Sequence, residues 1–158
     1  MADIEITVQD NSGEILRAFN AQLDVVLDVL GLQAENHAKQ IISDFVAYGN
    51  DGFIALPVGY HEKDTSRVDT GQLRNSVTHA VHGTDVYIGS NLQHAVWNEI
   101  GTGIYASQPG GRQSPWAYQG RDGKWHMTRG LFPIHFLKRA ASNYTDEYKK
   151  IIENFMTK

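Results

Sequence analysis

The chain has 158 residues with a formal net charge of -4 at pH 7, and 41% of its residues are hydrophobic. This length predicts a single domain over 1–158, with enough apolar and aromatic side chains for a core. The acidic balance argues against a general nucleic-acid-binding surface, which requires clustered lysine and arginine. Because the sequence has no cysteine, disulfides and thiolate metal sites are excluded. We expect a soluble protein with neither a signal peptide nor a membrane span.

The N-terminal part of the chain predicts a strand followed by a long amphipathic helix. Apolar and polar residues alternate over 3–8, which is typical of a half-buried strand. Over 11–48, apolar residues recur every three or four positions and predict a helix with Asn11 as its N-cap and a stop at Gly49. Gly31 lies in the middle of this helix, and the pattern leaves open whether it breaks there.

Three polar residues of this helix are interpreted from their spacing. Glu35 and Lys39 are four residues apart and are expected to form an ion pair on the solvent side. His37 lies on the apolar stripe, where we expect a core or boundary histidine with satisfied hydrogen bonds. A helix this long exceeds one small sheet, so its stripe packs either on its own domain or partly on another subunit.

The segment 50–67 is predicted to be a flexible, exposed loop. Pro57 and the flanking glycines disfavour a central strand, and loops of this length are usually functional or disordered. We expect its apolar residues to pack on another molecule. They are Phe53, Ile54, Leu56 and Val58.

Residues 68–130 are predicted to form a strand-rich core. Alternation over 77–81 and 86–89, with a turn between them, indicates an antiparallel hairpin. A short helix is expected over 92–100. Its buried face is expected to carry Leu92, Val96 and Ile100.

A second hairpin is predicted over 116–128, because an Asp-Gly turn signal separates two short strands. Its tryptophans, Trp116 and Trp125, are expected to cover the core or an interface. Helical spacing of apolar residues predicts a C-terminal helix over 134–156. Together these elements predict an α+β fold, in which one antiparallel sheet of both hairpins is packed by the long N-terminal helix and the C-terminal helix.

The triplet Asp69-Thr70-Gly71 precedes a short helix and is interpreted as its cap. Asp69 and Thr70 carry side-chain oxygens of the kind that accept hydrogen bonds from the first helical N–H groups. Gly71 permits a tight turn. Leu73 is expected to share the buried face of that helix with the valine four residues later, while Arg74 projects elsewhere.

The same triplet is also the motif of retroviral-type aspartic proteases, in which one aspartate from each subunit of a dimer activates water. That chemistry requires a buried apolar strand before the motif, whereas 63–67 is polar. A dimeric protease that uses Asp69, Thr70 and Gly71 is therefore the alternative, and the cap is the favoured interpretation.

Two further patterns are weak signals for ligands. His79 and His82 lack a third ligand at a spacing that completes a metal site, so they are interpreted as surface or turn histidines. Gly101 and Gly103 resemble a phosphate loop, but the strand, helix and lysine of such a loop are missing. We therefore expect no cofactor and no metal.

Several motifs occur in an informative order over roughly residues 66–140. They comprise Asp69, Thr70, Gly71, Leu73, Arg74, Glu99, Gly101 and Thr102, followed by Ser114-Pro115-Trp116, Gly123-x-Trp125, Thr128-x-Gly130 and Phe136-Leu137. Their order and spacing resemble the small tail-component family of long-tailed bacteriophages and prophages, whose members belong to the neck or head–tail joining region. Two departures from that family are His94, where tyrosine is usual, and the longer segment 50–67.

The resemblance implies a structural virion protein without catalysis or a cofactor. It implies that copies form a ring between the DNA-filled head and the tail, next to head-completion and tail-terminator or tube proteins. DNA would pass through the lumen without specific binding. The implied location is the neck or tail of the virion, after synthesis in the bacterial cytoplasm. A non-catalytic binding module encoded in a prophage is a further alternative.

Overall fold

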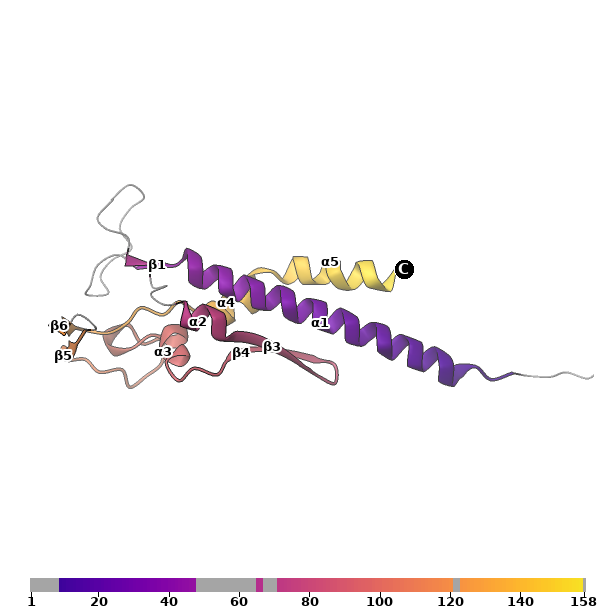
Figure 1. Cartoon of the computed structure of the whole chain (residues 1–158), viewed down its shortest axis with the longest axis horizontal. Coiled ribbons are helices and arrows are strands. Elements are labelled where there is room, and N and C mark those ends of the chain that lie inside the picture. The colour runs from indigo at the N-terminus through magenta and orange to yellow at the C-terminus, as the bar shows by residue number, and fades with distance from the viewer. Residues whose placement is uncertain (1–8, 48–64, 67–70, 121–122, 158) are drawn as a thin grey trace, which may run out of the picture.

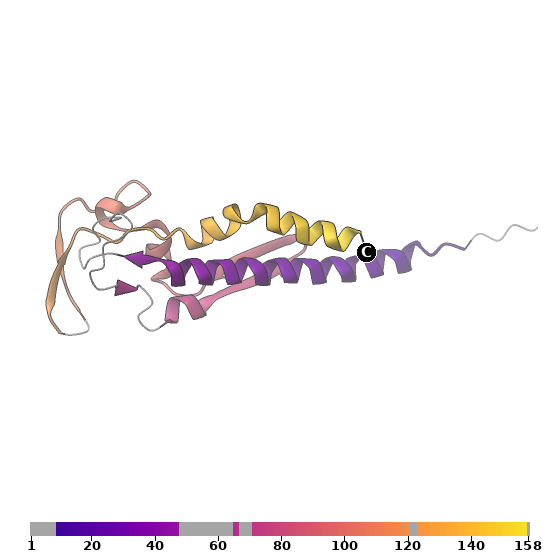
Figure 2. The same ribbon diagram turned by 90° about the horizontal axis from the view of Figure 1, so that it is seen from above.

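The computed structural model describes residues 9–47, 65–66, 71–120 and 123–157 and shows an elongated molecule (Figure 1). In chain order, the elements are α1 (Ser12–Asp44), β1 (Val46–Ala47), β2 (Thr65–Ser66), α2 (Gln72–Ser76), β3 (Val77–His82), β4 (Asp85–Ser90), α3 (Ala95–Ile100), the short 3-10 helix η1 (Gly103–Tyr105), β5 (Trp116–Gln119), β6 (Trp125–Thr128), α4 (Phe136–Asn143) and α5 (Thr145–Met156). Helix α1 contacts the β3–β4 hairpin, α2, α4 and α5. The β5–β6 hairpin and the start of α1 lie at opposite ends (Figures 1 and 2).

The predicted α+β class is confirmed, but the prediction of one sheet is wrong. Within the described residues, the strands form three separate two-stranded antiparallel sheets, β1–β2, β3–β4 and β5–β6. The β3–β4 hairpin packs along α1, whereas β5–β6 lies beyond the other end of that helix (Figure 1). Alternation of apolar residues identifies strands, but it does not specify which strands pair. The prediction therefore placed two distant hairpins in the same sheet.

Helix α1 runs unbroken through Gly31 over 33 residues. The N-cap of α1 is Asn11, as predicted, but the Asn11 side chain forms no cap hydrogen bond. The neighbouring Asp10 carboxylate instead accepts a hydrogen bond from the backbone N–H of Ser12 at 2.9 Å. The predicted strand at 3–8, which precedes it, lies outside the described residues.

The end of α1 at Asp44 comes earlier than the predicted end at 48. Phe45 is extended, with ψ of 106°, and Val46 and Ala47 then pair with 65–66. This strand pairing is a tertiary contact between distant segments, which local periodicity does not report. The rest of the predicted loop over 50–67 lies outside the described residues.

The hairpin β3–β4 agrees with the prediction and extends it. All six residues of each strand are paired, from Val77 opposite Ser90 to His82 opposite Asp85. The turn therefore consists of two residues, and Gly83 adopts φ of 62°, which glycine tolerates without strain. His82 is a strand residue, not a turn residue.

The hydrophobic core lies between the C-terminal half of α1, β3, α3 and the segment that leads into α4. Its most completely buried large side chains are Ile42, Val77, Ile134 and Phe136. Each such side chain contributes roughly 1.5–3 kcal/mol by leaving water. Leu73 and Leu137 pack against this cluster from α2 and α4. The N-terminal half of α1 extends away from it.

Two helical predictions are corrected by this packing. In α3, Ala95 is buried and Val96 is 49% exposed, so the predicted face with Val96 is wrong. The predicted helix over 134–156 is two helices, because the chain leaves helical geometry at Tyr144, with φ of -114°. The Tyr144 ring stacks on His37 of α1 at 3.5 Å, and this contact accompanies the break.

Candidate assembly interface

Glu99 holds the start of α4 in place. Its two carboxylate oxygens accept hydrogen bonds from the backbone N–H groups of Leu137 and Lys138 at 2.9 and 3.0 Å. His135, which precedes α4, has φ of 54°, an uncommon conformation outside glycine. A carboxylate at a helix N-terminus satisfies orphaned N–H groups and interacts favourably with the helix dipole. Glu99 therefore has a structural role in joining α3 to α4.

Gly101 and Thr102 belong to a close crossing of two backbone segments. Thr102 and Leu131 exchange backbone hydrogen bonds, and the Thr102 hydroxyl accepts a further one from the Leu131 N–H at 2.9 Å. A Cβ on Gly103 would lie 1.9 Å from a backbone oxygen of Arg129. The glycines of this region allow backbone contact, so the weak phosphate-loop pattern has a structural explanation.

Of the triplet 69–71, the structure describes Gly71. This glycine has φ of 70° and is the residue immediately before α2. Asp69 and Thr70 lie outside the described residues, as do the candidate interface residues Phe53, Ile54, Leu56 and Val58. Leu73 packs on the core and Arg74 is half-buried. Gly71 itself is the N-cap residue of α2, whereas the prediction gave Asp69 and Thr70 that position. A side-chain hydrogen bond from Asp69 or Thr70 to this helix, and the protease alternative, remain predictions.

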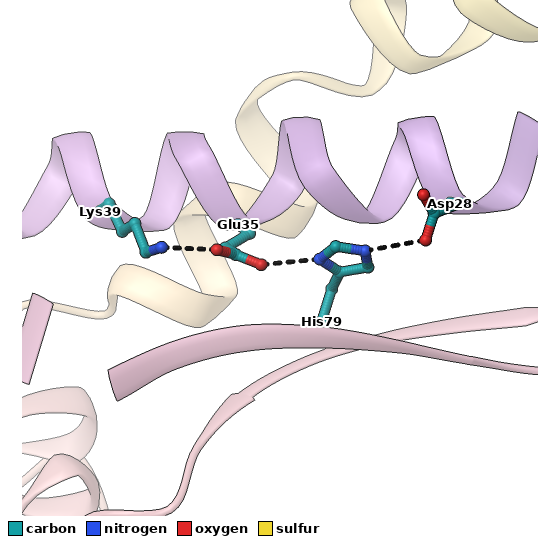
Figure 3. Close-up of polar contacts among 4 residues, drawn as sticks. All are labelled: Asp28, Glu35, Lys39 and His79. Carbon is teal, nitrogen blue, oxygen red and sulfur yellow. Dashed lines mark hydrogen bonds and ion pairs between the residues drawn. The ribbon is translucent and has the colours of Figure 1, made fainter. Parts of the chain in front are cut away.

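A polar cluster joins α1 to β3 around His79 (Figure 3). The His79 ring contacts the Glu35 carboxylate through Nδ1 at 2.6 Å and the Asp28 carboxylate through Nε2 at 3.2 Å. Lys39 donates to the other oxygen of Glu35. The His79 side chain is 17% exposed and that of Glu35 13%. The Glu35–Lys39 pair is confirmed, but its predicted place on the solvent side is wrong, as is the surface interpretation of His79.

The cluster shifts the pKa values of its members in opposite directions. The hydrogen bond with Glu35 raises the pKa of His79 above its ordinary value, against the opposing effect of burial, and Asp28 adds to the rise. Burial alone would raise the pKa of Glu35, but the hydrogen bonds from Lys39 and His79 outweigh it and lower the pKa. The cluster is therefore an ion-pair network between two elements.

His37 forms a second polar contact, between α1 and α5. The Tyr148 hydroxyl donates to the Ala140 carbonyl at 2.7 Å, so its oxygen accepts from His37 Nδ1 at 3.0 Å. His37 Nε2 lies 3.3 Å from both the Gln33 amide nitrogen and a Glu147 oxygen. Burial raises the pKa of Tyr148 to about 12, with Glu147 adding to it. The interpretation of His37 as a satisfied buried histidine agrees with these contacts.

These polar groups connect elements of the fold. Among the described residues, no three His, Asp, Glu or Cys side chains are placed to hold a metal ion. Asp28 and Glu35 of α1 each contact the His79 ring of β3, and Lys39 contacts Glu35.

The N-terminal half of α1 presents apolar side chains to solvent. Ile15 is 66% exposed, Leu16 60% and Phe19 46%. Further along, α1 and α5 enclose an apolar groove with a volume of about 110 Å³. Its lining includes Phe19, Leu23, Leu30, Ile152, Phe155 and Met156. We call this surface, from Ile15 to the groove, the helix patch.

The β5–β6 hairpin forms a second apolar surface at the other end of the molecule. Trp125 is 72% exposed and Met127 59%, on the same face of the hairpin. Trp116 is half-buried, with the Arg112 guanidinium 5.4 Å from its ring centre. The tryptophans do not both cover the core, so for Trp125 an interface is the remaining interpretation. We call residues 112–120 and 123–129 the hairpin patch.

The chain segments that contain the start of α1 and the β5–β6 hairpin have opposite charge. Residues 1–30 contain six acidic residues and one basic residue, whereas residues 101–139 contain six basic residues and one acidic residue. Glu14, Asp24, Arg112 and Arg129 are all exposed. The net charge of the whole chain does not reveal this asymmetry. Counting charge by segment reveals it without a structure.

Comparisons with protein-family models, curated proteins and solved structures found no match. Among the described residues, no helix has the length and apolar character needed to cross a membrane. The function is therefore inferred from the two patches and from the resemblance of the motifs.

Proposed function

We propose that this chain is a structural protein that assembles into a ring in the neck or tail-completion region of a long-tailed phage. One observation carries the proposal: an elongated molecule exposes apolar surfaces at both of its ends. Exposed apolar patches of this kind mark interaction sites in proteins. Large aromatic residues such as Trp125 are typical of the contacts that carry binding energy.

The roles of the motif residues support a structural function. Glu99, Gly101 and Thr102 maintain the junction between α3, η1 and α4 through backbone hydrogen bonds. The same residues carry the resemblance to tail-component proteins. In this proposal the ring lies between head-completion proteins and tail-terminator or tube proteins. It encircles DNA without specific contacts, and it has no enzymatic activity.

Imaging of phage particles tests the proposal directly. We expect a closed ring of this chain at the junction of head and tail, and a monomer or small oligomer of the isolated protein by light scattering. Particles made without its gene should contain heads and tails that remain separate. Normal particles from such a deletion, or one or two unsymmetrical copies in the virion, would contradict the proposal.

A further inference from the structure

We propose that neighbouring copies join head to tail, with the hairpin patch of one copy seated on the helix patch of the next. This contact deepens the proposed ring function and rests on it. Both patches are exposed, both are apolar at their centres, and they lie at opposite ends of the same molecule.

Charge complementarity identifies a second copy as the occupant of the helix patch. Glu14 and Asp24 are exposed on α1 outside the lining of the groove, and they belong to the acidic segment of the chain. The exposed Arg112 and Arg129 belong to the basic segment and flank the hairpin. Complementary charges steer association and select against wrong partners. A contact between two helix patches would instead bring acidic segments together.

The apolar parts of the two patches also suit each other. Trp125 and Met127 project from a two-stranded hairpin, a narrow element. The groove between α1 and α5 is concave and apolar along its lining. A large aromatic side chain that enters such a groove buries apolar area at low conformational cost.

The geometry of the contact is compatible with a ring. Because the two patches are different surfaces, each copy retains a free patch after binding one neighbour. Such a heterologous contact closes into a ring when the rotation between copies divides a full turn, and otherwise extends as a filament. Two unlike patches at opposite ends are the requirement for this mode.

Photo-crosslinking between copies tests the contact. A benzophenone amino acid replaces Phe19 in full-length protein, which is prepared both isotopically labelled and unlabelled and then mixed. We expect crosslinks between labelled and unlabelled chains that map to residues 112–129, at high protein concentration and in isolated particles. The same probe at Lys150, an exposed position on α5, is the control. Intermolecular crosslinks that map to α1 or α5, or the absence of any between chains, would overturn the proposal.

Charge reversal supplies a second, independent measurement. We expect Glu14→Lys with Asp24→Lys, or Arg112→Glu with Arg129→Glu, each to reduce the crosslink yield on the order of tenfold. A chain with all four changes should recover much of the yield, because the charges again complement each other. Lys150→Glu is the matched control and should leave the yield unchanged. Failure of the combined variant to recover, with its circular dichroism unchanged, would contradict the charge argument.

A basic surface with aromatic residues is also typical of nucleic-acid binding. The same variants distinguish a DNA-binding surface from a contact between copies. If Arg112→Glu with Arg129→Glu abolishes retention on double-stranded DNA and leaves the crosslink yield unchanged, the hairpin patch is a DNA surface and the proposal is wrong. Different results would contradict the proposed contact and the proposed ring function. Particles with a ring but without this crosslink contradict the contact, whereas the crosslink in a protein absent from particles contradicts the phage function.

Discussion

At the scale of single residues, Gly31 determines how closely β3 approaches α1. A Cβ at this position would lie 2.4 Å from Cδ2 and 2.8 Å from Cγ of the His79 ring. The ring sits over the glycine between Asp28 and Glu35, so the missing side chain creates the space for the polar cluster (Figure 3). Glycine inside a helix normally costs about 1 kcal/mol relative to alanine, and the packing of His79 accounts for it here.

A double-mutant cycle tests this interpretation of Gly31. We expect Gly31→Ala alone to lower the free energy of unfolding by about 1–3 kcal/mol, because the new methyl group overlaps His79. In a His79→Ala background the same change should stabilise by up to about 1 kcal/mol, because helix propensity then dominates. Urea denaturation of the four proteins measures both values. Equal changes in both backgrounds would show that the ring and the glycine do not interact.

The pKa shifts of His79 and Glu35 predict how stability depends on pH. The pKa of His79 is raised in the folded state. Its contribution to stability is therefore fully present at a pH below the ordinary pKa of 6.5, and it is lost as the pH rises through the folded pKa. The pKa of Glu35 is lowered in the folded state. Its contribution to stability is therefore fully present at a pH above the ordinary pKa of 4.5, and it is lost as the pH falls through the folded pKa. Both contributions are present between these two values.

We therefore expect the free energy of unfolding to decrease as the pH is raised from about 6 to about 8.5, and to decrease less in His79→Gln. Urea denaturation at a series of pH values measures this difference. His82→Gln is the matched control, since His82 lies on the same strand and outside the cluster. Identical pH profiles for the wild type and His79→Gln would show that the cluster does not contribute to stability.

Asp69 provides a residue-scale test of the remaining enzymatic alternative. If it caps α2, we expect Asp69→Ala to lower the free energy of unfolding by about 0.5–2 kcal/mol, with no activity to lose. Thermal melting and a peptide-cleavage assay on both proteins measure the two quantities. Specific cleavage by the wild type that disappears in the variant would establish the protease.

At the scale of elements, the N-terminus of α4 is capped by a side chain of α3. Glu99 of α3 accepts from two N–H groups of α4. We expect Glu99→Ala to cost about 0.5–2 kcal/mol of unfolding free energy, in the range of lost helix caps. Glu153→Ala, an exposed glutamate of α5, should change stability by less than about 0.5 kcal/mol. Equal effects of the two substitutions by urea denaturation would contradict the capping role.

The sequence predicted elements with strong local patterns and missed those that depend on distant contacts. Alternation located β3 and β4, and apolar periodicity located α1 and showed its great length. The burial of Glu35 depends on His79 from another element, and the break at Tyr144 accompanies its stacking on His37. Neither contact can be predicted from the spacing of residues within one element. The unlike charges of the two chain segments were readable from the sequence, because they follow from position along the chain.

At the scale of the whole molecule, the two ends of α1 differ in burial, and we propose that one serves folding and the other assembly. Ile41 and Ile42 of the C-terminal half are buried in the core, whereas Ile15 and Leu16 of the N-terminal half are exposed. Substitutions at Ile15 and Leu16 should therefore affect contacts between copies, and substitutions at Ile42 should affect folding. A single helix thus connects the stable core of one copy to the surface proposed to receive the next.

This division predicts opposite effects for two kinds of variant. We expect Ile15→Ser with Leu16→Ser to leave the melting temperature nearly unchanged, because exposed side chains lose little on replacement. The same variant should fail to join heads to tails when it replaces the wild-type protein during particle assembly. Ile42→Ala should instead cost about 2–5 kcal/mol of stability, as large-to-small core substitutions do. Val96→Ser, at an exposed apolar residue outside both patches, is the control and should change neither property. Normal particles assembled from Ile15→Ser with Leu16→Ser would show that the first half of α1 is not an assembly surface.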